Sequence, residues 1–205
     1  MLQHKRFLVG YKVFFALLGF GAIVTEIATL VERGVFRPFN FFSYFTIETN
    51  ILVVITLLLS ALALAAGKRG RFDTLRGATA VYILVVGIGF TALLSHVEGL
   101  VLTAMPWDNI VLHYIIPVAV LIDFAIDRPR RAFAFKNCLV WLLFPAVYIT
   151  YALTRGALTG WYPYPFLNPA TKGYGSVVLV VASLFALGLV LIWGTAKYTS
   201  IHKRR

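Results

Sequence analysis

The sequence is poor in acidic residues and in cysteine, and both shortages narrow the possible classes of protein. Only 8 Asp and Glu residues accompany 19 Lys and Arg residues, which gives a formal net charge of +11. The single cysteine, Cys138, cannot form a disulfide within the chain, and its place at the start of an apolar run indicates a packing residue. The motifs of common soluble enzymes are also missing: there is no phosphate-binding glycine loop, nucleophile elbow, CxxC or HExxH.

No polar stretch is long enough to form a separate soluble domain, and there is no internal repeat. Hydrophobic residues make up 60% of the 205 positions, against roughly 45–50% in ordinary soluble domains. They are gathered in apolar runs long enough to cross a bilayer as helices. We therefore predict an all-α, polytopic membrane helix bundle in a single domain, residues 1–205. Its six spans are expected at about 7–30, 41–66, 75–96, 108–126, 134–154 and 174–197.

The basic residues predict the orientation of these spans. The first run follows basic residues as a signal peptide does, but it is longer than the roughly 7–15 apolar residues of such a peptide, which indicates a retained helix. Basic residues concentrate on one side: Lys5, Arg6, Lys68, Arg69, Arg71, Arg76, Arg128, Arg130, Arg131, Lys136, Lys197, Lys203, Arg204 and Arg205. The other side carries Arg33, Arg37, Arg155 and Lys172. The positive-inside rule then places both termini in the cytoplasm. Because topology explains the positive charge, we expect the lipid bilayer as a partner and no nucleic acid.

Polar side chains within the spans gather in the outer third of the predicted bundle. Ionisable groups are costly there, so each is a candidate functional residue. The set is Glu26, Thr46, Glu48, Thr49, Asn50, His96, Glu98, Asp108, Asn109 and His113, with Arg155 after the fifth span. Two exceptions lie elsewhere. Lys12 is expected to snorkel towards the inner interface, and Asp123 is expected to pair with Arg128 at the inner boundary.

Thr46 and His113 are expected at the same depth. Each lies about six residues inside its predicted span, roughly 9 Å below the outer helix end. A hydroxyl and an imidazole at equal depth can act as a nucleophile and its general base. Ser43 and Asn50 share a helical face with Thr46, whereas Glu48 points elsewhere. On the other span, Asn109 lies one turn before His113, and Asp108 is a possible carboxylate to orient the imidazole.

Structural interpretations of the same residues stay open at this stage. A membrane threonine commonly bonds to the carbonyl four residues earlier, and a buried histidine or Glu26 commonly forms an interhelical hydrogen bond. His96 and Glu98 are typical of a solvated helix end. His96 and His113 are also potential haem ligands. The aromatic loop around Trp161, Tyr162 and Tyr164 is typical of an anchor at the headgroup level.

Three segments resemble one family of membrane proteins. They are Arg155–Pro169 (RGALTGWYPYPFLNP), Phe39–Asn50 (FNFFSYFTIETN) and Leu112–Pro117 (LHYIIP). Together they look like the bacterial Pr6Pr family, which is more distantly similar to the animal FAR-17a type of androgen-induced and androgen-dependent membrane proteins. The resemblance extends over essentially the whole chain. It implies location in the inner (plasma) membrane of a bacterial cell.

The animal relatives are threonine hydrolases that cleave fatty acid esters of hydroxy fatty acids. The resemblance therefore implies that Thr46 is the nucleophile and His113 the base, with Thr49 as a rival nucleophile. Expected substrate-binding residues are Asn50, Asn109, Arg155, Trp161, Tyr162 and Tyr164; expected supporting residues are Ser43, Glu26, Glu48, His96 and Asp108. No cofactor or metal is expected. The main alternative is a membrane binder or transporter of lipids or small amphiphiles without covalent chemistry.

Overall fold

The structure, a computed structural model, describes residues 2–97 and 103–201. Within these residues, six helices are long and apolar enough to cross a membrane, as the sequence predicts. They comprise α1 (Leu2–Glu32), α3 (Phe45–Ala65), α4 (Asp73–Leu93), α5 to α6 (Pro106–Ile126), α7 to α8 (Phe135–Thr159) and α9 (Pro169–Ile201). Glu98, Lys203, Arg204 and Arg205 lie outside the described residues. The fold is thus an all-α helix bundle typical of a multi-pass membrane protein.

Two of these spans are interrupted by other helix types. The fourth consists of α5 (Pro106–Ile110), a π-helical turn (Val111–Ile115) and α6 (Ile116–Ile126). The fifth consists of α7 (Phe135–Cys138), a 3₁₀ turn (Leu139–Leu142) and α8 (Leu143–Thr159). Short pieces occupy two of the connections: α2 (Pro38–Phe41) and a 3₁₀ turn at Pro165–Leu167. α9 loses helical geometry at Lys172 and Gly173, so its continuous apolar part begins where the sequence predicts its span.

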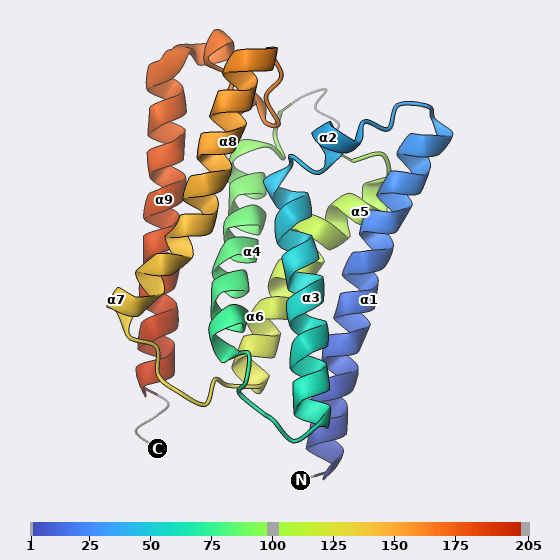
Figure 1. Ribbon diagram of the computed structural model, residues 1–205, viewed down its shortest axis with the longest axis vertical. Coiled ribbons are helices and arrows are strands. Elements are labelled where there is room, and N and C mark those ends of the chain that lie inside the picture. Colours follow the sequence, from blue (N-terminus) through green and yellow to red (C-terminus); the bar gives the residue numbers. More distant parts are fainter. Residues whose placement is uncertain (1, 98–102, 202–205) are drawn as a thin grey trace.

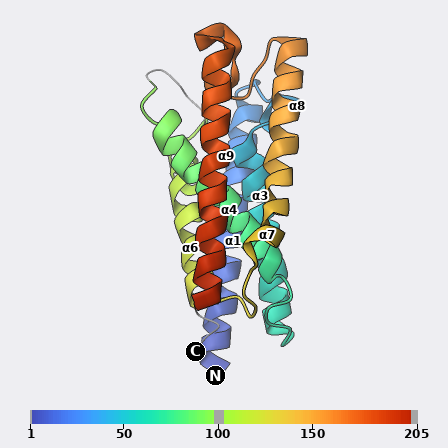
Figure 2. The same cartoon turned by 90° about the vertical axis from the view of Figure 1, so that its left-hand side faces the viewer.

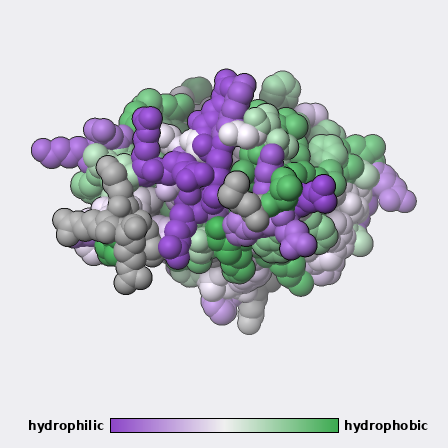
Figure 3. Space-filling view, turned by 90° about the horizontal axis from the view of Figure 1, so that it is seen from below, coloured by the Kyte–Doolittle hydropathy of each residue, from purple (hydrophilic) through white to green (hydrophobic). Residues whose placement is uncertain are grey.

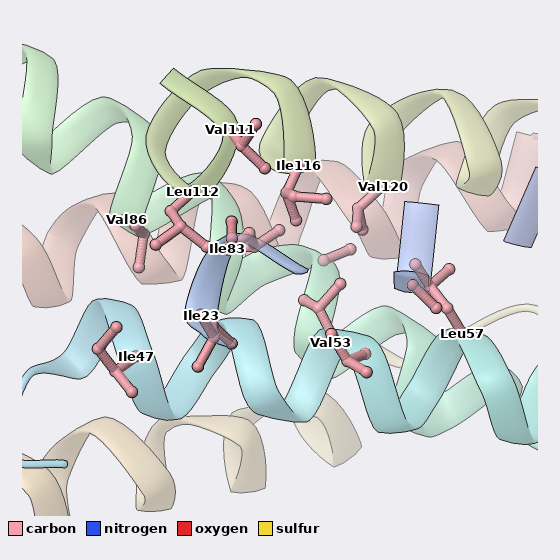
Figure 4. Close-up of a cluster of buried hydrophobic side chains, with 14 of the residues drawn as sticks. Ile23, Ile47, Val53, Leu57, Ile83, Val86, Val111, Leu112, Ile116 and Val120 are labelled. Carbon is pink, nitrogen blue, oxygen red and sulfur yellow. The ribbon is translucent and has the colours of Figure 1, made fainter. Parts of the chain in front are cut away.

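Helices α1, α3, α4 and α6 pack together as the core of the bundle, and α8 and α9 lie together on one side of it, next to α4 (Figure 1). Figure 4 shows the central cluster, in which aliphatic side chains of all four central helices interlock; it includes Ile23, Val53, Ile83 and Ile116. α1 begins and α9 ends at the same end of the bundle (Figure 1), which is called the terminal end below. The opposite end carries α2 and the loop between α8 and α9.

The outside of the bundle is strongly apolar. Large hydrophobic side chains such as Phe14, Leu62 and Val178 are about two-thirds exposed, at 60%, 67% and 67%. Soluble monomers rarely expose contiguous apolar surface on this scale, whereas lipid-facing helices do so by necessity. Length, composition and exposure therefore all indicate that these helices span a membrane.

Among the predicted span boundaries that differ from the structure by more than a turn, two affect the site. The second span does not begin at 41, because Pro38 opens the separate helix α2 and the chain turns before α3 starts at Phe45. The fifth span does not end at 154. The helix continues through Arg155 until Gly160 adopts a left-handed conformation (φ 72°) and stops it. Arg155 is therefore part of α8.

The expected pair of Asp123 with Arg128 is also wrong. Asp123 instead forms ion pairs with Lys12 of α1 and with Arg76 of α4, where an Arg76 nitrogen lies 2.8 Å from a carboxylate oxygen. Lys12 does not snorkel: it is fully buried, and its ammonium lies between Asp123 and Asp127. A basic side chain in mid-helix needs either solvent or an acidic partner, and α6 supplies the partner here.

Candidate functional site

Thr46 and His113 meet inside the bundle at the end opposite the termini. The Thr46 hydroxyl oxygen lies 3.3 Å from Nε2 of His113, and both side chains are buried. The predicted depths are nevertheless wrong, because Thr46 is the second residue of α3 and His113 is the eighth of the helix that begins at Pro106. The two residues still meet because the start of α3 packs against the π-helical turn that carries His113, where Asn50 of α3 donates to the Leu112 carbonyl.

His113 lies in the π-helical turn, and two contacts besides Thr46 hold its imidazole ring. Its Nδ1 lies 3.1 Å from the backbone oxygen of Asn109. The ring of Phe90 stacks on the imidazole with centroids 3.9 Å apart. Pro117, four residues later, has no N–H to pair with the His113 carbonyl and so favours a local departure from α-helical geometry. π-turns are frequent at functional sites.

Tyr164 is the second group in contact with the Thr46 hydroxyl. Its phenolic oxygen lies 3.3 Å from Oγ1 of Thr46 and accepts a 3.2 Å hydrogen bond from the Thr46 backbone N–H. The sequence predicts this tyrosine as a substrate-binding residue or as an aromatic anchor at the headgroup level, and not as a partner of Thr46. Burial raises the pKa of Tyr164 to about 12, so the phenol keeps its proton at neutral pH.

Asn50 supports the backbone around Thr46 from the next turn of α3. Its side-chain nitrogen donates to the carbonyl of Thr46 at 2.8 Å and to the carbonyl of Leu112 at 3.3 Å. Both amide hydrogens are therefore engaged, and Asn50 ties α3 to the π-turn. Thr49 is fully buried and its hydroxyl has no hydrogen-bond partner among the described residues. Its hydroxyl has neither of the two partners that Thr46 has.

Arg155 and Ser43 belong to a hydrogen-bonded polar cluster beside the site. Arg155 donates to the Ser43 hydroxyl at 2.9 Å and to the Asn40 side chain at 2.7 Å. Its guanidinium also lies 4.3 Å from the ring centroid of Trp161. Ser43 precedes α3, so it does not share a helical face with Thr46; it contacts Tyr151 of α8 instead. This polar cluster connects the loop before α3 to α8.

The remaining predicted site residues do not hydrogen-bond to Thr46 or the His113 side chain within the described part of the chain. Glu26 accepts the backbone N–H of Ala104, and its carboxyl group lies beside that of Asp108, which is fully buried. Asp108 does not bond to His113, because the Asn109 carbonyl takes that place. Glu48 is half-buried, and His96 is exposed beyond the end of α4. Tyr162 packs against Gly156, where no larger residue would fit.

Two cavities share Thr46 and Tyr164 in their linings. A narrow apolar cavity of about 90 Å³ lies between α4, α8 and α9, and includes Phe90, Tyr148 and Leu184 in its lining. Figure 2 shows α8 and α9 standing apart on this side. A second cavity of about 270 Å³ has polar side chains in its lining, among them Glu26, Arg33, Arg37 and His113, and is called the polar cavity below. Thr46 and Tyr164 line both, so a molecule reaching from one cavity to the other passes their hydroxyl groups.

Three residues of the site escaped prediction from the sequence: Phe90, Tyr148 and Tyr151. Each is an aromatic within a long apolar run, where aromatic side chains most often serve only as core or lipid-facing surface. Tyr148 donates to the Ser43 carbonyl at 3.0 Å and Tyr151 contacts the Ser43 hydroxyl. For the two tyrosines, a phenolic hydroxyl within a span was the available signal, since such a group needs a partner; the sequence around Phe90 carries none.

Comparisons with protein-family models, with curated proteins and with solved structures found no match.

Proposed function

We propose that this protein is an intramembrane ester hydrolase in which Thr46 is the nucleophile and His113 the general base. The observation that carries the proposal is the 3.3 Å approach of the Thr46 hydroxyl to His113 Nε2, with Nδ1 of the same ring on a carbonyl. The separation is at the long end for a hydrogen bond, as is common in catalytic pairs without bound substrate.

The partner of Nδ1 determines which nitrogen can act as the base. A carbonyl oxygen only accepts hydrogen bonds, so Nδ1 carries the hydrogen that it donates to Asn109. In the neutral ring, Nε2 is then unprotonated and faces the Thr46 hydroxyl. Asn109 thereby performs the orienting role that a carboxylate performs in other nucleophile–base pairs.

Tyr164 is placed to stabilise the negative charge that develops on the ester carbonyl oxygen. The phenol accepts the Thr46 N–H, so its own O–H points to Thr46 Oγ1 at 3.3 Å and can turn to the neighbouring carbonyl oxygen when Oγ1 attacks the ester. Such a donor in a site sheltered from water stabilises a tetrahedral intermediate more effectively than water does. Asn50 does not take this role, because its N–H groups are bound to backbone carbonyls.

The reaction proceeds in two balanced steps. Thr46 Oγ1 attacks the ester carbonyl while its proton moves to His113 Nε2; the tetrahedral intermediate then expels the alcohol, which takes that proton, and leaves an acyl-threonine. Water next attacks the acyl-threonine, again giving its proton to His113, and the threonine hydroxyl is restored as the acid departs. No cofactor is required for either step.

The two cavities suggest how a fatty acid ester would lie. The apolar cavity suits the acyl chain, the hydroxyl groups of Thr46 and Tyr164 mark the position of the ester, and the polar cavity suits the alcohol portion and the incoming water. A fatty acid ester of a hydroxy fatty acid, the substrate implied by the Pr6Pr and FAR-17a resemblance, matches this order of apolar and polar parts. With both termini in the cytoplasm, the ester would be near the outer face of the bacterial plasma membrane.

A fluorophosphonate probe tests the proposal directly, because an activated hydroxyl attacks its phosphorus and displaces fluoride. We expect the purified protein in detergent to be labelled, Thr46→Ala to abolish labelling, and Thr49→Ala to preserve it. Thr49 is the matched control, since it is a buried threonine on the same helix without a base beside it. Equal labelling of wild type and Thr46→Ala would contradict the assignment. A complete lack of labelling would favour a lipid binder that uses the same apolar cavity.

Removing the phenolic hydroxyl of Tyr164 is expected to slow ester cleavage. Tyr164→Phe should lower kcat by roughly 10²-fold with little change in KM, because loss of one oxyanion donor acts mainly on the transition state. Tyr162→Phe is the control, since no hydrogen bond to this hydroxyl occurs among the described residues. Steady-state hydrolysis of a long-chain ester measures both. A Tyr164→Phe enzyme with wild-type kcat would exclude the oxyanion role.

A further inference from the structure

A third cavity lies at the terminal end of the bundle, far along the helices from Thr46. It has a volume of about 650 Å³ and lies between the loop that follows α3 and the loop that follows α6. Its lining includes Arg69, Arg71, Arg130, Arg131 and Trp141. Figure 3 views this end of the molecule, where hydrophilic side chains run across the middle of the face. We call this cavity the basic pocket.

The two basic loops are held together although they carry charge of the same sign. Asp73, at the start of α4, accepts the backbone N–H of Arg130 at 2.6 Å. Asp127 accepts the Arg69 side chain at 2.8 Å. The Arg130 side chain also crosses Gly70 so closely that a Cβ there would lie 2.6 Å from its Cγ. Gly70 has φ 87°, a conformation suited to glycine. The approach of the loops is therefore built into the fold.

The carboxylates near this pocket already have hydrogen-bond or ion-pair partners within the protein. One Asp73 oxygen accepts from Arg76 at 3.0 Å and the other from the N–H of Arg130. Although burial alone would raise the pKa of Asp127, the cations of Arg76 and Lys12 hold it below its usual range, so this carboxylate is charged and already paired. Within the described residues, Arg71, Arg130 and Arg131 form no ion pair. A concentration of unpaired cations in a hollow attracts an anion.

The rim of the basic pocket places that anion beside the lipid phase. Asn137, Cys138 and Trp141 contribute to the lining from the start of the fifth span. On the same short stretch, Leu139 and Val140 are exposed, as are other apolar side chains of the span. A ligand with a phosphate and acyl chains would satisfy both surfaces at once. Guanidinium groups bind phosphate oxygens in a paired geometry, and basic pockets at the cytoplasmic ends of spans bind anionic lipid headgroups.

We propose that the basic pocket binds the phosphate of an anionic phospholipid in the leaflet that surrounds the terminal end of the bundle. This site is separate from Thr46 and does not depend on ester hydrolysis. If the terminal end faces the cytoplasm, as the basic residues predict, the lipid belongs to the cytoplasmic leaflet. A phospholipid and a water-soluble phosphate would contact the arginines through the same phosphate group. The test therefore has to distinguish binding of a lipid from binding of free phosphate.

Native mass spectrometry of the detergent-purified protein measures the binding. Phosphatidylglycerol and phosphatidylcholine are titrated into wild type, the double variant Arg71→Gln/Arg131→Gln, and the control Arg128→Gln. Arg128 is an exposed cation of the same loop that does not line the pocket. Both arginines of the double variant are exposed and form no ion pair among the described residues, so the fold is preserved. We expect wild type and Arg128→Gln to prefer phosphatidylglycerol, and the double variant to bind it about tenfold more weakly.

Three results would overturn the proposal. The first is equal affinity of wild type for the two lipids, and the second is unchanged phosphatidylglycerol affinity in the double variant. The third is displacement of phosphatidylglycerol by inorganic phosphate at equal concentration, which would assign the pocket to a soluble phosphate ligand. A thermal unfolding midpoint of the double variant within about 2 °C of wild type verifies that weaker binding does not reflect unfolding.

Discussion

His113→Asn is expected to lower kcat/KM for a long-chain ester by at least about a hundredfold, because a positioned general base contributes roughly 10²- to 10⁴-fold. Asparagine keeps an N–H near the position of Nδ1 that can still donate to the Asn109 carbonyl. It offers no basic atom at the position of Nε2, 3.3 Å from the Thr46 hydroxyl. The variant therefore removes the base while preserving the local hydrogen bond.

The matched control for this variant is His96→Asn, which changes an exposed histidine beyond the end of α4. Its hydrolysis rate should equal that of wild type. Kinetics with a chromogenic long-chain ester should show the loss mainly in kcat, since the acyl chain contacts the apolar cavity and not the imidazole. A His113→Asn enzyme within threefold of wild type would remove His113 from the mechanism. Near-wild-type fluorophosphonate labelling of the same variant would lead to the same conclusion.

The helical architecture could be predicted because it depends on one-dimensional properties of the chain. An apolar run of sufficient length forms a helix in a bilayer whatever its neighbours are, since its backbone has no other partner there. Ends of helices depend on local chemistry and were predicted less well. The chain forms a separate short helix, α2, from Pro38 before α3 begins, and α8 continues past Arg155 until Gly160 ends it.

The contacts between helices could not be predicted in the same way. Thr46 and His113 were paired from expected depth and from the resemblance, and they do touch, although the depth argument used a helix start that proved wrong. Tyr164 was taken as an interfacial aromatic because nothing in a loop sequence indicates that its hydroxyl turns inward to Thr46. Asp123 was assigned to its neighbour in sequence, whereas its partners come from α1 and α4. Partners of buried polar groups depend on helix rotation and adjacency, which hydropathy does not encode.

Asp123→Ala is expected to destabilise the protein by about 3–5 kcal/mol, the usual consequence of removing one partner from a buried ionic group. Asp123 is the point where α1 and α4 meet α6: its carboxylate contacts the fully buried Lys12 and accepts two hydrogen bonds from Arg76, at 3.2 and 2.8 Å. Without it, only the single carboxylate of Asp127 remains close to Lys12. Unfolding in a detergent mixture of increasing denaturing strength, followed by circular dichroism, measures the loss.

The control Arg128→Ala should change the free energy of unfolding by less than about 0.5 kcal/mol, because this side chain is exposed and has no ion pair among the described residues. The double variant Lys12→Met/Asp123→Ala should be more stable than Asp123→Ala alone, since it also removes the buried ammonium that Asp127 alone would otherwise have to neutralise. Equal stability of Asp123→Ala and Arg128→Ala would show that the cluster does not hold the helices together.

Because the cluster lies at the terminal end and Thr46 at the other, the folded fraction of Asp123→Ala should retain the wild-type kcat. A kcat below the wild-type value in fully folded Asp123→Ala would instead show that the position of α6, and with it His113, depends on this distant charge.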